Sequence, residues 1–164
     1  MNLASFDPGK NCAGAGVYVA GLLVMATLIR GDGPLDVAQK VAQWFSQIRL
    51  VSTLSAIQYD ALVTEGQQVY PGPRKNDPND LFPLTFCCGA VHALVEAREK
   101  HSILPGKWTR GTPKDIRLAR AEAALSPSEQ KVLGAVKCPK SLRHNVVDAI
   151  ALGRWFLDNQ GKVS

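Results

Sequence analysis

A chain of 164 residues, of which 46% are hydrophobic, is long enough to bury the core of one domain, and this composition excludes a disordered or fibrous protein. A formal net charge of +5 is compatible with an acidic partner, of which nucleic acid is the commonest. None of the four cysteines belongs to a C-x-x-C pair, so we expect reduced, largely buried thiols in place of a disulfide framework or a zinc site: Cys12, Cys87, Cys88 and Cys138.

The sequence pattern predicts neither a leader peptide nor a membrane span. The chain opens with a strand-like segment, where a leader would have a basic stretch followed by an apolar one. The apolar run 17–29 is too short for a membrane helix and is interrupted by Gly21. We therefore expect a cytoplasmic protein that does not bind a membrane.

The first thirty residues predict three short strands. Residues 2–6 form an apolar segment that ends in the turn sequence DPG. Residues 14–20 alternate and carry β-branched and aromatic side chains, and Gly21 makes a tight turn into a strand over 22–29. The result is a three-stranded meander.

A helix, a strand and a longer helix are expected next. Apolar residues recur at helical spacing over 35–52, and residues 60–65 form a short strand closed by a glycine. A polar loop rich in proline and glycine covers 67–78. A long helix then extends from residue 79 or 80 to about residue 100.

The last third of the chain begins with a short fifth strand over 102–104. A basic loop covers 107–114, and a proline at its end opens a helix that extends to about residue 125. The sequence SPSE, starting at Ser126, is a capping box that begins another helix. The final helix covers 141–158.

Neither a repeat nor a linker divides these elements, so residues 1–164 form a single mixed α/β domain with a five-stranded sheet flanked by helices. Functional side chains of open α/β sheets gather at strand ends. Asp7 ends the first strand and Glu65 ends the fourth, and these two strands can be neighbours. Asp148 lies among apolar residues of the last helix. The three acids are therefore the candidate catalytic residues.

Three clustered carboxylates repel one another, and two Mg²⁺ ions roughly 4 Å apart would relieve that repulsion. One ion activates a water for in-line attack on a phosphodiester, and the other stabilises the leaving oxygen. Hard carboxylate oxygens suit Mg²⁺ or Mn²⁺ better than zinc. The pattern thus predicts metal-dependent phosphodiester hydrolysis with Mg²⁺, for which Mn²⁺ substitutes.

Each acid has an ordinary structural alternative. Asp7 can hydrogen-bond its own backbone in the turn, and Glu65 can be an exposed strand end. Asp148 can pair with Arg143 or Arg154 on the helix surface, although its apolar neighbours favour burial. The three together are more specific than any one of them.

Four segments carry a resemblance to a known family: FDPGKNCAGAGVYV followed by GLL, ALVTEG, DPNDLFPLTFCCGAV and HNVVDAIALGRW. They resemble, in order and at comparable intervals over residues 1 to about 157, the RuvC-type Holliday-junction resolvases of the ribonuclease H-like superfamily, small phage-type members in particular. The resemblance implies a ribonuclease H-like fold and a metal-dependent endodeoxyribonuclease of DNA recombination and repair that cuts four-way junctions.

By the same resemblance, Asp7, Glu65 and Asp148 are metal ligands. The family usually has a fourth ligand, Asp or His, one turn before the final Asp, and here the sequence departs from it. Asn145 is three residues before Asp148 and His144 is four before it, so both can reach the site. We expect Asn145 as the metal ligand and His144 as a catalytic helper that binds metal or moves a proton.

Basic and aromatic residues in the loops that follow the catalytic strands are candidate DNA-binding residues. The cations would contact phosphates, which makes affinity dependent on salt: Arg74, Lys75, Lys107, Arg110 and Lys114. Tyr70 can stack on bases at a branch point or pack against neighbouring prolines. Trp108 can stack as well, although a core or interface role suits it better.

Two symmetric nicks in a four-way junction require two active sites, so we expect a homodimer that binds branched DNA. The apolar helix after Asn79 is its expected interface. Sugar-kinase and actin-like ATPases open with a similar hairpin but need a second lobe, for which 164 residues leave no room. Two alternatives stay open: a related nuclease that acts on other branched DNA or on RNA–DNA hybrids, and a DNA-binding protein with a degenerate site.

Overall fold

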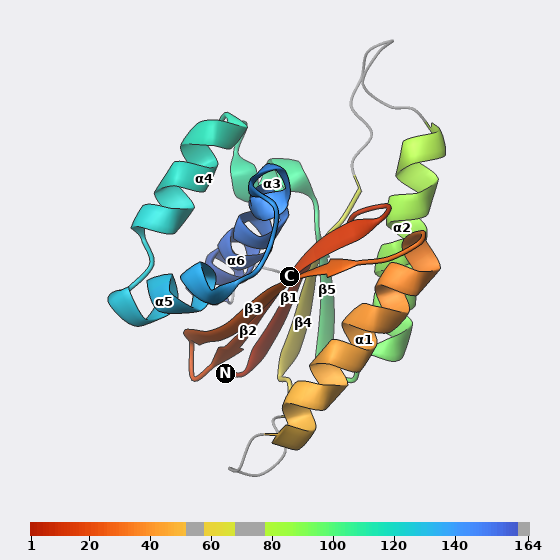
Figure 1. Ribbon diagram of the computed structural model, residues 1–164, viewed down its shortest axis with the longest axis horizontal. Helices are drawn as coiled ribbons and strands as arrows, with labels where there is room; N and C mark the ends of the chain where they lie inside the picture. Colours follow the sequence, from red (N-terminus) through yellow and green to blue (C-terminus); the bar gives the residue numbers. More distant parts are fainter. Residues whose placement is uncertain (52–57, 68–77, 161–164) are drawn as a thin grey trace.

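The computed structural model describes residues 1–51, 58–67 and 78–160. Within them, five strands form one sheet in the order β3-β2-β1-β4-β5 (Figure 1). The first three strands are antiparallel, whereas β4 and β5 run parallel to β1. The strands are β1 (Leu3–Asp7), β2 (Cys12–Val19), β3 (Leu22–Arg30), β4 (Ala61–Glu65) and β5 (Glu99–Ile103). The predicted meander and the neighbouring positions of strands 1 and 4 are confirmed.

Helices cover both faces of the sheet (Figure 1). One face carries α1 (Pro34–Val51) and α2 (Pro78–Leu94). The other face carries α6 (Arg143–Asp158), beside which lie α3 (Pro105–Thr109), α4 (Lys114–Ala123) and α5 (Pro127–Ala135), with a short 3-10 helix (Lys140–Leu142) before α6. None of the described helices combines the length and apolar character that a membrane crossing needs.

Side chains of one strand alternate between these two layers. In β1, Leu3 packs in the core beneath α6, whereas Ala4 and Phe6 pack in the core beneath α1 and α2. In β4, Val63 lies on the α6 face and Leu62 on the other. This alternation decides on which face the last residue of each strand lies.

Glycines allow α6 to approach the sheet closely. A Cβ on Gly14 would lie 1.9 Å from the carbonyl oxygen of Asn145 at the start of α6. A Cβ on Gly153 would lie 2.5 Å from the ring of Tyr18. Gly14 of β2 and Gly153 of α6 therefore let this helix rest directly on β1 and β2.

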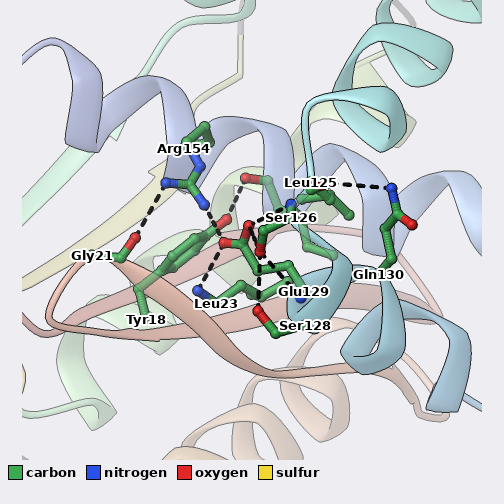
Figure 2. Close-up of polar contacts among 10 residues, drawn as sticks. Tyr18, Gly21, Leu23, Leu125, Ser126, Ser128, Glu129, Gln130 and Arg154 are labelled. Atoms are coloured by element: carbon green, nitrogen blue, oxygen red, sulfur yellow. Dashed lines mark hydrogen bonds and ion pairs between the residues drawn. The ribbon is translucent and has the colours of Figure 1, made fainter.

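A buried polar network fastens α5 and α6 to the β2–β3 hairpin, and Figure 2 shows its side chains. The Glu129 carboxylate accepts hydrogen bonds from the backbone N–H groups of Leu23 (3.0 Å) and Ser126 (2.9 Å) and pairs with Arg154. The Arg154 guanidinium also donates to the carbonyl of Gly21 and lies over the Tyr18 ring. Ser126 and Glu129 form the predicted capping box.

Two of the predicted element bounds are wrong. The helix expected to reach about residue 100 ends at Leu94, and β5 begins at Glu99, earlier than the strand predicted over 102–104. The strand EKHSI is polar because it lies at the sheet edge and pairs only with β4, so it carries no apolar alternation. The loop predicted over 107–114 contains the end of α3, which buries Trp108. Cys87 and Cys88 are buried free thiols, as expected.

Candidate active site: three carboxylates at one edge of the sheet

The three acids named from the sequence come together at one edge of the sheet. Asp7 ends β1 on the face that Leu3 occupies, and Glu65 ends β4 on the face of Val63, so strand alternation points both toward α6. Asp148 lies on α6, the helix that covers this face. Because β1 and β4 are parallel neighbours, their carboxyl ends lie side by side.

Asp7 is buried at the end of β1. Burial raises its pKa well above the ordinary value, and the negative charges of Glu65 and Asp148 raise it further. The charges of Lys114 and Arg117 act in the opposite direction. The pKa of Asp7 therefore responds to both of the other acids.

Glu65 is half-buried, and burial together with the charge of Asp148 raises its pKa to about 7. Its side chain is fixed by Trp108, whose indole Nε1–H donates to Oε2 at 3.0 Å. Its backbone is fixed as well, because the Cys88 thiol donates to the Glu65 carbonyl at 3.3 Å. The reading of Glu65 as an exposed strand end is wrong.

Asp148 is only 5% exposed and is paired, but with neither of the arginines that its own helix offers. Arg117 on α4 donates from Nη2 (2.8 Å) and Nε (3.2 Å) to Oδ1. Lys114 lies 3.6 Å from Oδ2. Arg143 pairs instead with Glu122, and Arg154 with Glu129, so the surface pairing considered for Asp148 is wrong.

Arg117 is the site residue that the sequence analysis missed. Its guanidinium lies 4.7 Å from the centre of the Trp108 ring, which itself holds Glu65. Lys114, expected as a DNA-binding residue, also lies against Asp148. The three-residue spacing of Lys114 and Arg117 places them on the same side of one helix. This spacing alone does not indicate that they pair with Asp148, because only tertiary packing places α4 against α6.

The donor set suits a hard divalent cation, since it consists of carboxylates that repel one another. In the part of the chain that the structure describes, no three His, Cys, Asp or Glu side chains are arranged closely enough to hold a metal ion as they stand. Two cationic side chains, Arg117 and Lys114, stand instead against Asp148. The acids thus attract positive charge. Their carboxylates fit a divalent metal ion that would replace Arg117 and Lys114.

The two candidates for a fourth ligand differ in their surroundings. The side-chain amide of Asn145 donates to the thiol of Cys12 at 3.4 Å. Burial raises the pKa of that thiol, and the charge of Asp7 raises it further. Asn145 is therefore linked to the first residue of β2, which lies near Asp7. His144 is half-buried at the start of α6.

The expected DNA-binding residues lie only partly within the described structure. Tyr70, Arg74 and Lys75 are outside the described residues. Lys107 is exposed on α3, and Arg110, directly after this helix, is exposed as well. The helix follows β5, whose last residue pairs with Glu65. A polar hollow lies where β2 begins and β3 ends, and it is lined by Asn11, Arg30, Gly31, Asp32 and Lys40.

Solved structures share this fold. Thermus thermophilus RuvC matches with a TM-score of 0.62 and 16% identity, over 99% of this chain and 96% of that one. T. thermophilus RuvC in complex with a Holliday junction substrate matches with a TM-score of 0.57, at the same identity and coverage. The yeast mitochondrial Holliday junction resolvase Ydc2 matches with a TM-score of 0.55 and 9% identity, over 98% of this chain and 81% of that one.

No protein-family model and no curated protein matches the sequence. At these identities the structural likeness concerns the fold, and it confirms the RuvC-type, ribonuclease H-like fold that the sequence motifs implied.

Proposed function

We propose that this protein is a metal-dependent endodeoxyribonuclease that resolves Holliday junctions. The observation that carries the proposal is the convergence of Asp7, Glu65 and Asp148 at one edge of a sheet with the fold of known resolvases. One of those structures holds a Holliday junction substrate. A nuclease of this kind would act in DNA recombination and repair.

Asp7, Glu65 and Asp148 would hold the metal, with Asn145 as a fourth oxygen ligand and His144 beside it. Mg²⁺, or Mn²⁺ in its place, would supply an activated water and charge stabilisation at the phosphodiester. The chain's own contribution is to hold the carboxylates in place: the Trp108 indole orients Glu65, and close packing of α6 on the sheet brings Asp148 to Asp7. Burial makes each carboxylate a stronger attractor of cations.

Basic residues on both sides of the acids would bind the DNA backbone. Lys107, Arg110 and Lys114 lie on the side of α3 and α4, and Arg30 and Lys40 line the hollow on the side of β3. Arg74, Lys75 and Tyr70 follow Glu65 in the sequence and belong to the same proposed surface. Such contacts position the duplex and carry no sequence preference.

The proposed active form is a homodimer, for which α2 offers an interface. Phe82 and Phe86 lie one turn apart on this helix and are 72% and 53% exposed, and Leu94 at its end is exposed as well. Large aromatic side chains at this exposure are typical of a covered surface. A twofold dimer with α2 at its interface would carry one active site in each subunit, which gives the two sites that paired cleavage needs.

Cleavage of synthetic substrates in Mg²⁺ tests the proposal. A four-way junction should be nicked at two symmetric positions within the lifetime of one complex, and linear duplex of the same sequence should remain intact. Cleavage of an RNA–DNA hybrid in preference to the junction would identify a different ribonuclease H-like nuclease. Junction binding without any cleavage would indicate a DNA-binding protein with a degenerate site.

A further inference from the structure

The carboxylate of Asp148 is occupied by a side chain of another helix. Its Oδ1 accepts two hydrogen bonds from Arg117, at 2.8 Å and 3.2 Å, and its Oδ2 faces Lys114 at 3.6 Å. The Asp148 side chain is 6% exposed, so removal of Arg117 would leave a buried anion with only Lys114 beside it. Arg117 therefore neutralises the charge of Asp148, as a bound metal ion would.

Arg117 is held in place at its other side by the residue that orients Glu65. Its guanidinium lies over the Trp108 ring at 4.7 Å, and the indole N–H of Trp108 donates to Glu65 at 3.0 Å. A continuous series of contacts thus connects Asp148 to Glu65 through α4 and α3. Each of the two acids thus contacts a side chain of this series with which a metal would compete.

The helix that carries Arg117 lies at the surface of this face. No residue of α4 is fully buried, although Leu118 and Ala121 pack against the core, and no side chain caps its first turn. The exposed Lys114 begins the helix, directly beside Arg117. An arginine on such an element can exchange one anion for another at low cost, and its planar fork suits a phosphate as well as a carboxylate.

We propose that Arg117 is a positioning residue that passes from Asp148 to a phosphate of bound DNA, so that DNA binding frees Asp148 for the divalent cation. The inference rests on the proposed function and adds to it a coupling between substrate and metal. Because coupling free energies are reciprocal, DNA raises the affinity for the cation and the cation raises the affinity for DNA by the same factor. The cation then binds only weakly in the absence of DNA.

The first test measures Mn²⁺ binding to the full chain without DNA. Arg117→Met keeps an unbranched apolar side chain but removes the guanidinium and its charge, and it should bind Mn²⁺ about tenfold more tightly than the wild type, within the usual range of such couplings. Arg120→Met, which removes an exposed charge from the same helix, should leave Mn²⁺ affinity unchanged. Arg117→Lys keeps the charge without the fork and should lie in between, which guards against a folding defect of the Met variant.

The second test measures junction affinity in EDTA at several salt concentrations. Arg117→Met should bind the junction more weakly, and the slope of log Kd against log salt should fall by about one, as for the loss of one phosphate contact. Unchanged Mn²⁺ affinity in Arg117→Met would overturn the inference and leave the proposed function standing. Tighter Mn²⁺ binding with an unchanged salt slope would overturn the transfer to phosphate. Absence of Mn²⁺ binding in all variants, with or without junction, would overturn the proposed function as well.

Discussion

Replacing Glu129 by alanine should destabilise the protein far more than its position on a short helix suggests. The carboxylate is 2% exposed and accepts hydrogen bonds from Leu23, from the backbone and hydroxyl of Ser126, and from Arg154. Alanine would leave the partly buried guanidinium of Arg154 and several buried donors without this acceptor. Removing one partner of a buried pair costs about 3–5 kcal/mol, which is a large part of the roughly 5–15 kcal/mol that stabilises a domain.

Urea unfolding followed by circular dichroism measures this loss, and the chain offers a matched control. Glu122 also pairs with an arginine, at 3.2 Å, but its side chain is 42% exposed. Glu122→Ala should therefore cost less than about 1 kcal/mol. Equal losses in the free energy of unfolding for the two variants would refute the reasoning that burial makes the Glu129 contacts strongly stabilising. The double variant Glu129→Ala/Arg154→Met should lose less free energy of unfolding than the sum of the losses in the two single variants.

Three further predictions concern the site. Gly14→Ala should lower the free energy of unfolding by about 1–3 kcal/mol and reduce cleavage, because its Cβ would lie 1.9 Å from the Asn145 carbonyl and push α6 away; an unchanged melting curve would contradict this. The raised pKa values of Asp7 and of Glu65 (about 7, ordinarily 4.5) stabilise the protonated, metal-free fold below about pH 4.5, and this stability is lost as the pH rises through 7. Mg²⁺ should therefore raise Tm more at pH 8 than at pH 6, and an equal rise would argue against these carboxylates as ligands. Asn145→Asp should preserve or raise activity, whereas His144→Ala should lower it; wild-type rates in Asn145→Ala and His144→Ala would show that three carboxylates suffice.

The positions of the acids could be predicted because they follow from local patterns. Asp7 and Glu65 each end an apolar strand just before or at a turn, and strand alternation then fixes the face on which they lie. Asp148 stands among apolar residues of a helix, which indicates burial. These signals are carried by a few neighbouring residues and need no knowledge of how the helices pack.

The partners of the acids could not be predicted, because they depend on how separate elements dock. Arg117 reaches Asp148 only because α4 packs beside α6, and Trp108 reaches Glu65 only because α3 folds back after β5. The start of β5 was misplaced for a related reason: Glu99 begins a polar edge strand whose pairing with β4 leaves no hydrophobic pattern in the sequence.

The central claim is that Asp7 belongs to a catalytic metal site, and single-turnover cleavage of a four-way junction in Mg²⁺ tests it most directly. Asp7→Asn removes the charge but keeps the shape, so the rate should fall by several orders of magnitude while the fold and junction binding persist. Glu99→Gln, which changes an exposed acid at the start of β5, at the opposite end of this strand from the site, is the matched control and should cleave at the wild-type rate. EDTA should abolish cleavage by the wild type. A wild-type rate in Asp7→Asn, or full cleavage in EDTA, would contradict the account.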